Sequence, residues 1–222
     1  MNELGRVTRA KAGRPTREQA EARHAELLDR ALDHFLDKGY EQATIEAIAS
    51  DVSMTKRTVY ARYADKSALF LAAVDRAIER YNIAEERIIA TRVPDLRQTL
   101  INIAMLRIDL VASEEGLKLQ RIINTESYRF PEIMAKSYEQ GAKPTIRFLA
   151  SILAEETAAG SLAIDQPVAA ANVFMSMVVS APVRFITAGI PLPAGQLQER
   201  VAFAVKLFLE GAKPRPSGPM GD

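Results

Sequence analysis

The stretch TIEAIASDVSMTKRTVYARYADKSALF (Thr44–Phe70) decides the fold, because it holds two short helical patterns separated by a tight turn. Thr44 has the side chain of a helix N-cap and precedes the apolar-periodic run Ile45–Asp51. After a break at residues 52–54, Thr55 is suited to cap the next helix in the same way. A three-residue turn between two short helices is typical of a helix-turn-helix module.

The two faces of the second short helix differ in chemistry. Its apolar residues can join one core with residues of the preceding helix and turn, and that core set is Ile48, Val52, Met54, Val59 and Tyr63. The opposite face then carries Lys56, Arg57, Tyr60 and Arg62. A solvated surface helix would explain this face, and so would a helix that lies against phosphates and base edges in the major groove.

Upstream of this module lies a longer helix, and before it a basic segment. Leu27, Leu28, Ala31, Phe35 and Leu36 form a helical stripe that ends at Lys38-Gly39, a basic last turn followed by a C′ glycine. We predict a flexible arm over residues 1–22. Residues 1–17 carry five basic side chains against one acidic side chain, so the rest of a chain with net charge +1 carries −3. The arm is either a solvated tail or a DNA contact in which Arg14 enters the minor groove.

Downstream of the module the whole chain has helical periodicity. Asp65 can cap a fourth helix predicted over residues 66–92, and Val93-Pro94 marks a boundary. Five more helices are expected, at residues 95–113, 114–128, 131–157, 167–188 and 196–211, with a kink or break at Pro144 and at Pro182. The predicted fold class is all-α, with a DNA-binding domain at 23–68, a helical regulatory and dimerisation domain at 69–211, and a disordered tail at 212–222.

Composition excludes several functional classes. The 222 residues contain no cysteine and only two histidines, His24 and His34, which do not share a helix face. Disulfides and zinc–thiolate sites are therefore absent, and neither a catalytic constellation, a metal site nor a cofactor is predicted. The N-terminus lacks the apolar region of a secretory signal, and polar residues interrupt the most apolar run, residues 171–186. We therefore expect a cytoplasmic protein that is not an enzyme.

The run Leu27–Phe70 resembles the DNA-binding domain of the tetracycline-repressor (TetR) family over about forty-five residues without a gap. The motifs that carry the resemblance are Phe-x-x-x-Gly-Tyr at Phe35, Gly39 and Tyr40; Thr-Ile-x-x-Ile-Ala at Thr44, Ile45, Ile48 and Ala49; Thr-x-Tyr at Thr58 and Tyr60; and Lys-x-x-Leu-Phe at Lys66, Leu69 and Phe70. Two positions depart from the family pattern, because Ser53 and Arg57 stand where many members have glycine.

The resemblance implies a set of DNA contacts. Lys56 and Arg57, near the N-terminus of the recognition helix, are the candidates for base edges, and Arg57 could pair with guanine O6 and N7. Thr44, Tyr60 and Lys66 resemble family phosphate contacts, Arg62 could serve either purpose, and Thr58 could contact phosphate or simply pack. With Thr55 and Arg14, these residues form the predicted DNA-binding set.

Beyond residue 91, the segment TESYRFPEI (Thr125–Ile133) and the last helix look like the AefR-like subgroup of C-terminal domains. The resemblance implies a small-molecule effector and a homodimer through the helices at 167–188 and 196–211; an alternative for these apolar helices is the core of a monomer. Candidate effector-binding residues are Met105, Arg107, Ile108, Arg121, Glu126, Phe130, Met134, Phe148, Phe174 and Met177. The apolar members of this set can equally be ordinary core residues, and the charged ones can lie on a polar face.

The sequence therefore predicts a ligand-responsive transcriptional regulator, a repressor that binds a palindromic DNA operator as a homodimer and does not engage a membrane. Its recognition helices would enter successive major grooves about 34 Å apart, or lie at a longer family-type spacing. Two alternatives remain: an all-α small-molecule-binding or enzymatic domain with a vestigial helix-turn-helix, and a nonspecific nucleic-acid packaging protein. The near-neutral net charge speaks against the second alternative.

Overall fold

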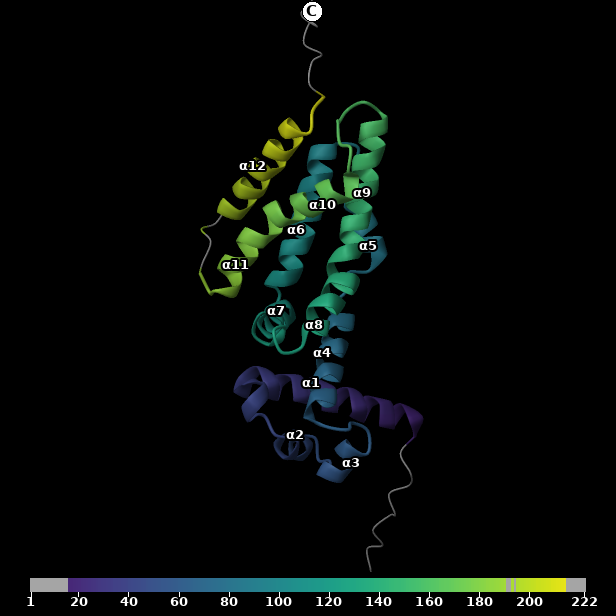
Figure 1. Cartoon of the computed structure of the whole chain (residues 1–222), viewed down its shortest axis with the longest axis vertical. Helices are drawn as coiled ribbons and strands as arrows, with labels where there is room; N and C mark the ends of the chain where they lie inside the picture. Colours follow the sequence, from purple (N-terminus) through teal and green to yellow (C-terminus); the bar gives the residue numbers. More distant parts are fainter. Residues whose placement is uncertain (1–15, 191–192, 194, 215–222) are drawn as a thin grey trace, which may run out of the picture. The chain divides into compact units, whose positions relative to one another are not determined.

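The computed structural model describes residues 16–190, 193 and 195–214, and every regular element within these ranges is a helix (Figure 1). The prediction of an all-α fold is confirmed. The chain divides into two compact units, Met1–Ala73 and Val74–Asp222. The predicted tail begins within the described part, at residues 212–214, and its remaining residues lie outside it.

Unit 1 is built from α1 (Arg17–Gln42), α2 (Ile45–Asp51), α3 (Lys56–Tyr60) and the first half of α4 (Lys66–Arg80). The three predicted N-caps are confirmed. The hydroxyls of Thr44 and Thr55 accept hydrogen bonds from backbone amides of α2 and α3, and the carboxylate of Asp65 accepts one from the amide of Ala68 at 2.8 Å. Local side-chain chemistry thus fixes where each short helix begins.

The first helix begins earlier than the sequence analysis expected. The predicted arm extends to residue 22, whereas α1 starts at Arg17. The cause is a reciprocal capping box, in which Thr16 accepts from the amide of Gln19 while the Gln19 side chain accepts from the amide of Thr16. Near the other end, Gly39 has φ 74° and breaks the helical path, as the predicted C′ glycine requires.

Aromatic rings form the centre of the core of unit 1. Phe35, Tyr40 and Phe70 meet with ring centroids 4.9–5.9 Å apart, and the apolar stripe of α1 packs around them. Tyr63 is also buried, and its hydroxyl lies 2.5 Å from Nε2 of His24 on α1. The first helix is therefore held against the segment that follows α3.

Unit 2 contains the second half of α4 and all later helices. These are α5 (Glu85–Ile89), α6 (Leu96–Ala112), α7 (Glu114–Glu126), α8 (Pro131–Lys136), the π-helix η1 (Ser137–Ala142), α9 (Lys143–Ala158), α10 (Pro167–Met175), the π-helix η2 (Ser176–Ser180), α11 (Ala181–Thr187) and α12 (Gln196–Gly211). The prediction of one helix over 66–92 is wrong, because α4 ends at Arg80. In the segment that follows Arg80, the side chain of Ile83 is buried.

Both internal prolines follow a widened helical turn. Residues Ser137–Ala142 are π-helical just before Pro144, and Ser176–Ser180 are π-helical just before Pro182. A proline inside a helix lacks the amide hydrogen and collides with the carbonyl four residues earlier, so the preceding turn must widen or bend. The kink or break predicted at each proline is thus present as a π-helical turn just before it.

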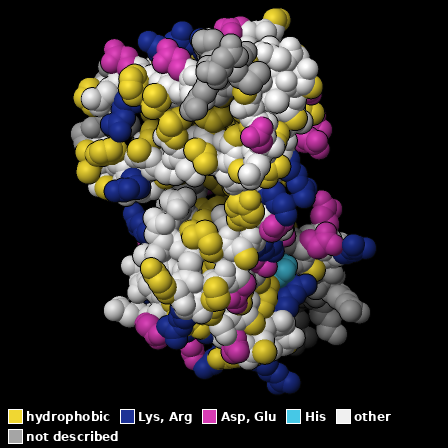
Figure 2. All heavy atoms as spheres, turned by 45° about the horizontal axis from the view of Figure 1, so that its top comes forward, with side chains coloured by type: hydrophobic (Ala, Val, Ile, Leu, Met, Phe, Trp, Pro, Cys, Tyr) yellow, Lys and Arg dark blue, Asp and Glu magenta, His cyan; other side chains and the backbone are white. Residues whose placement is uncertain are grey.

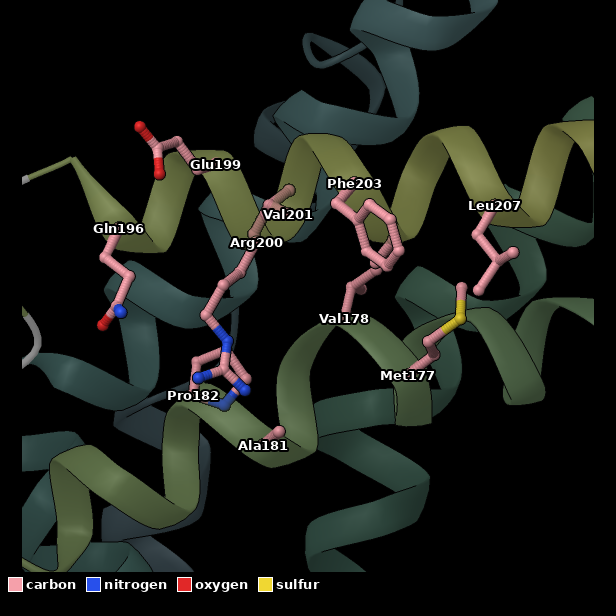
Figure 3. A pocket seen from close by; sticks show the side chains of 11 residues that line it. Met177, Val178, Ala181, Pro182, Gln196, Glu199, Arg200, Val201, Phe203 and Leu207 are labelled. Atoms are coloured by element: carbon pink, nitrogen blue, oxygen red, sulfur yellow. The ribbon is translucent and has the colours of Figure 1, made fainter.

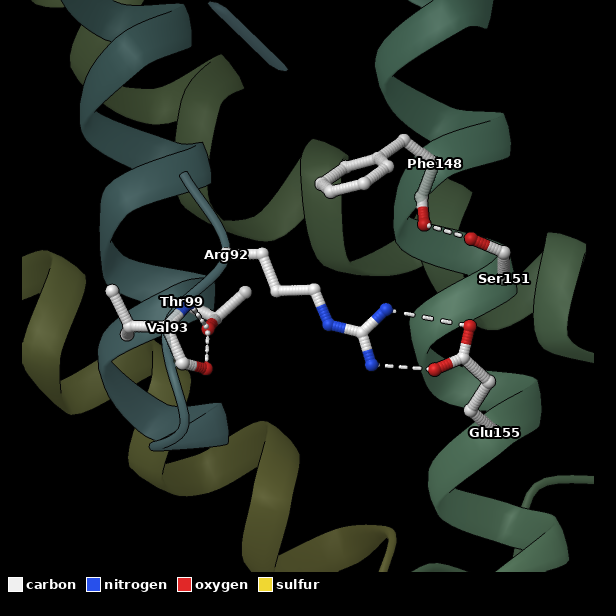
Figure 4. Close-up of polar contacts among 6 residues, drawn as sticks. All are labelled: Arg92, Val93, Thr99, Phe148, Ser151 and Glu155. Carbon is white, nitrogen blue, oxygen red and sulfur yellow. Dashed lines mark hydrogen bonds and ion pairs between the residues drawn. The ribbon is translucent and has the colours of Figure 1, made fainter. Parts of the chain in front are cut away.

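Helix α6 lies at the centre of unit 2 and contacts α7, α11 and α12, while α9 packs against α10 (Figure 1). The fully buried side chains include Leu100, Ile103 and Ile108 from α6 and Phe174 from α10. The segment between α5 and α6 is fixed by polar contacts. Arg92 donates two hydrogen bonds to Glu155 on α9, and the Thr99 hydroxyl donates to the carbonyl oxygen of Val93 (Figure 4).

Candidate nucleic-acid interface and effector cavity

Helix α3 presents nearly all of its polar side chains to solvent. Val59 is fully buried, whereas the remaining four residues of the helix, Lys56, Arg57, Thr58 and Tyr60, are exposed, as are Thr55 and Arg62 on either side. The helix is only five residues long and Val59 is its one buried residue, so its other side chains are exposed to solvent. The side chain of Arg57 has no hydrogen bond or ion pair with any residue in the described ranges, whereas its carbonyl oxygen accepts from the amide of Ala61.

Lys56 is engaged with the preceding helix. Its ammonium forms an exposed ion pair with Glu46 on α2 and lies 5.5 Å from the centre of the Tyr60 ring. The hydrogen bond between the two side chains raises the pKa of Lys56 and lowers the pKa of Glu46. Glu46 lies in the first turn of α2, and the sequence analysis did not identify it as the partner of Lys56.

Four more of the predicted contact residues already have structural partners. Thr44 and Thr55 cap α2 and α3, and the Thr55 hydroxyl lies 2.8 Å from the Thr58 hydroxyl. Lys66 donates to the carbonyl oxygens of Tyr40, Glu41 and Ala43 at 2.8–3.2 Å. These bonds use all three donors of its ammonium. In this arrangement Lys66 closes the end of α1 and contributes a fixed positive charge, and no donor remains for a phosphate.

The turn between α2 and α3 contains the one non-glycine residue with positive φ among those described. Ser53 has φ 53°, in the left-handed region that favours glycine. The amides of Ser53 and Met54 donate to the carbonyls of Ser50 and Ala49, which closes the turn. The sequence analysis noted serine in place of the usual family glycine, and the backbone adopts the left-handed conformation despite it. Arg14, the predicted minor-groove residue, lies outside the described residues.

Residues of unit 2 line a partly open cavity of about 360 Å³, here called the Arg107 cavity. Its lining comes from α4, α6, α7, α8, η1, η2 and the residues after α4: Ile78, Tyr81, Asn82, Arg107, Leu110, Val111, Gly116, Leu119, Gln120, Ile123, Met134, Ser137, Tyr138, Gly141, Ala142 and Ser180. Burial lowers the pKa of Arg107 and raises the pKa of Tyr81. The cavity therefore combines apolar walls with a few polar groups, as small-molecule sites do.

A close approach between two helices shapes one wall of this cavity. The Tyr81 hydroxyl lies 3.3 Å from the hydroxyl of Ser113, the N-cap of α7. A Cβ atom added to Gly116 would stand 1.6 Å from the Tyr81 oxygen and 2.4 Å from the carbonyl oxygen of Leu110. Only glycine fits at this point. Tyr81 and Gly116 were not among the predicted effector residues, and a glycine inside the first turn of an apolar helix was the one sequence signal available.

The predicted effector residues fall in different places. Arg107 and Met134 line the cavity, whereas Ile108, Phe174 and Phe130 are buried apolar residues. Met105, Phe148 and Met177 are partly buried against the core of unit 2, Glu126 is partly exposed, and Arg121 is exposed on α7. Helical periodicity alone did not separate the residues that line the cavity from those that pack beside it.

A second feature of unit 2 is an apolar surface on α10 and α12. Val168, Val173, Phe203 and Leu207 are 53–68% exposed. Beside this surface, residues of η2, α11 and α12 line a groove of about 450 Å³. In Figure 3, Phe203 and Leu207 of α12 face Met177 and Val178 of η2. On the face drawn in Figure 2, hydrophobic and charged side chains are interspersed.

The same surface includes a helix with an unusually apolar composition. Among the described residues, the continuous helical segment Pro167–Thr187 is long and apolar enough to cross a membrane by length and composition, and 22% of its most apolar window is buried. A helix that packs against a second protein surface passes the same test. An exposed apolar surface of this kind indicates an interaction site.

Comparisons with known proteins identify both units. Residues 27–73 match the family described as bacterial regulatory proteins, tetR family, and residues 98–211 match the AefR-like transcriptional repressor, C-terminal domain. In sequence, the chain is 25% identical over 130 residues to the uncharacterized HTH-type transcriptional regulator YdeS of Bacillus subtilis. That match covers 58% of this chain and 60% of YdeS, so it spans less than two thirds of the relative.

Solved structures resemble the chain over most of its length. The flavonoid-responsive regulator FrrA aligns with a TM-score of 0.69 and 29% identity, over 88% of this chain and 100% of FrrA. A TetR-family regulator from Mesorhizobium loti aligns with a TM-score of 0.71 and 24% identity, over 88% and 99% of the two chains, and so supports the fold alone. The helix-turn-helix with its capped short helices and the AefR-like helical unit together make this chain a member of the TetR family of transcriptional regulators.

Proposed function

We propose that this regulator is a repressor that binds an inverted-repeat operator as a homodimer, with α3 in the major groove. The observation that carries the proposal is the exposure of Lys56, Arg57 and Tyr60 on a helix anchored by Val59 alone. Lys56 and Arg57 stand at the N-terminal end of α3, the end that contacts bases in helix-turn-helix proteins. The DNA-binding domain is assigned to residues 23–68 and the regulatory domain to 69–211.

The homodimer proposal rests on the apolar surface of α10 and α12. Homodimer interfaces are more apolar than the rest of a protein surface, and this surface exposes valine, leucine and phenylalanine side chains. Two copies joined there would present two α3 helices to two half-sites. A dimer of this kind binds an operator whose symmetry matches its own.

The effector is assigned to the Arg107 cavity. FrrA, which shares 29% identity with this chain, responds to flavonoids, and the same class of small organic molecule is a reasonable type of effector here. For the effector to release DNA, it must bind the DNA-free conformation more tightly than the DNA-bound conformation. A coupling of about 1–3 kcal/mol would change operator affinity about 5- to 150-fold.

The test is a selection of genomic DNA fragments by the purified protein, followed by measurements on variants. We expect enrichment of one inverted repeat, because two identical α3 helices read two half-sites. Arg57→Ala should then weaken specific binding about tenfold to a hundredfold, the loss expected for one bidentate base contact. Arg147→Ala, at an exposed position on α9, is the matched control and should bind normally.

The results separate this proposal from its rivals. Enrichment without a common motif, together with a steep salt dependence, would identify a nonspecific nucleic-acid binder. No binding to any fragment would leave unit 1 without the proposed role. Specific binding that survives both Lys56→Ala and Arg57→Ala would keep the regulator but overturn the assignment of α3 as the reading helix.

A further inference from the structure

Arg107 is the only charged residue among those that line the Arg107 cavity. Its guanidinium is largely buried, and Nη1 donates one hydrogen bond to the carbonyl oxygen of Gly141 in η1, at 3.0 Å. Its Nε is buried and has no hydrogen-bond partner. Within the described ranges, no carboxylate lies within 4.0 Å of this side chain. The positive charge therefore faces the cavity without a negative partner.

An unpaired buried guanidinium is costly, and arginine cannot escape the cost by losing its proton. Proteins normally place an aspartate or glutamate beside such a group or satisfy all of its donors. Here the protein supplies one carbonyl oxygen for five N–H donors. The remaining donors match the geometry of a carboxylate or another anionic oxygen, which a guanidinium binds with two parallel hydrogen bonds.

The rest of the cavity limits the size and shape of such a ligand. Leu110, Leu119, Ile123 and Met134 provide apolar surface, and the volume of about 360 Å³ is near the lower end of the range for small-molecule sites. The phenol of Tyr81, whose pKa burial raises, stays protonated and can donate a hydrogen bond. A ligand that fits has a small apolar body and one acidic end.

We propose that the effector is a small amphipathic organic acid whose anionic oxygens pair with Arg107 and whose apolar body lies against α6 and α7. This inference rests on the proposed function only in calling the ligand an effector, because the binding itself requires no DNA. A carboxylate and a phenolate offer the same anionic oxygen chemistry. The experiment distinguishes these two sources.

The first arm measures ligand binding to the purified full-length protein without DNA, by isothermal titration calorimetry. The panel pairs aromatic and aliphatic carboxylates with their amides, for example 2-naphthoate with 2-naphthamide, and phenols such as 2-naphthol with their methyl ethers. We expect at least one acid to bind more than tenfold tighter than its neutral counterpart. Preference within the carboxylate pairs identifies a carboxylate ligand. Preference within the phenol pairs identifies a phenolate only if the affinity of the phenol also rises with pH while that of its methyl ether does not. If no acid binds more tightly than its neutral counterpart, the proposal is wrong.

The second arm tests Arg107 itself. Arg107→Gln should weaken binding of the preferred acid about 10- to 100-fold, as expected for the loss of charged hydrogen bonds, and should leave the neutral counterpart unaffected. Arg107→Lys restores the charge without the fork of donors and should recover part of the affinity. Arg97→Gln removes an exposed arginine from the same helix and should bind the acid normally. Equal loss in the Arg97 variant would overturn the assignment to Arg107.

Two further readouts keep the test decisive. Arg107→Gln should melt at the same or a higher temperature without ligand, because it removes an unpaired buried charge. If the variant does not fold, the comparison of acid with amide on the native protein still decides the proposal. Acid binding that depends on Arg107 but does not release the operator supports the anion site and counts against the proposed regulation. Specific operator binding by a protein that shows no preference for acids supports the proposed DNA-binding function and counts against the anion site.

Discussion

At the scale of single residues, Ser53 shows how a local conformation is imposed by its surroundings. The turn between α2 and α3 places Ser53 in the left-handed conformation, which is unfavourable for a residue with a Cβ atom. Two backbone hydrogen bonds stabilise the turn in this conformation. A left-handed conformation costs an ordinary residue about 1–2 kcal/mol, which the packing of the two helices must offset. The turn keeps α3 at a fixed position relative to α2, so this strain supports the reading helix.

We predict that Ser53→Val lowers the free energy of unfolding by about 1–2 kcal/mol, because a β-branched side chain tolerates positive φ poorly. Ser53→Asn and Ser53→Gly should stay within about 1 kcal/mol of the native protein, since both residues adopt this conformation readily. Urea unfolding followed by circular dichroism measures the difference. Equal stability of the valine and asparagine variants would show that position 53 is not left-handed in solution.

At the scale of helices, α2 and α3 are joined by charge as well as by apolar packing. Glu46 of α2 holds the ammonium of Lys56, one of the two candidate base-reading side chains. When DNA is bound, the Glu46 carboxylate and the DNA would compete for the ammonium of Lys56. If Lys56 contacts DNA as proposed, the pair would restrain DNA binding while it orients the side chain, and the strength of the pair falls as salt is added.

We expect Glu46→Gln to tighten DNA binding about twofold to fivefold at low salt, because it frees Lys56 and removes a negative charge near the phosphates. The gain should appear with operator and random DNA alike. Fluorescence anisotropy over a series of salt concentrations measures it. Asp37→Asn removes the same charge from an exposed position on α1 and serves as the control. An equal gain in both variants would mean that overall charge, and not the pair with Lys56, is responsible.

At the scale of the whole molecule, the proposed regulation requires that two copies of the chain act together. The apolar surface of α10 and α12 is the part of unit 2 best suited to join them, and Phe203 is its most exposed large side chain, at 68%. When one α3 helix of a dimer is bound to its half-site, the other α3 helix is held near the second half-site. Its effective concentration there is therefore raised. The proposed dimer interface on unit 2 would therefore control how tightly unit 1 binds DNA.

We predict that Phe203→Glu converts the dimer to a monomer and weakens operator binding more than tenfold, because a buried unpaired carboxylate opposes association. Sedimentation-velocity centrifugation measures the first effect, and anisotropy measures the second. Tyr128→Glu introduces the same charge at a residue that is 99% exposed, outside this surface, and should remain a dimer. A dimeric Phe203→Glu protein would place the interface elsewhere.

The sequence by itself determined the helix-turn-helix and most helix ends. Caps and turns depend on residues within about four positions of each other, so Thr44, Thr55 and Asp65 could be read directly from the chain. The same local chemistry placed α6 between Asp95 and Ser113. The capping box at Thr16 was also present in the sequence, but the basic charge around it led to a longer arm being predicted.

The tertiary structure alone decided which interior polar residues face a cavity. Helical periodicity marks positions that point toward a core, but it does not show whether the opposite wall is near or far. Arg107 and Arg121 each interrupt an apolar helix, and only packing distinguishes the buried cation from the exposed one. The break after Arg80 and the contact between Tyr81 and Gly116 also depend on residues distant in sequence. Long-range packing, which no local pattern encodes, therefore created the cavity that the effector is proposed to occupy.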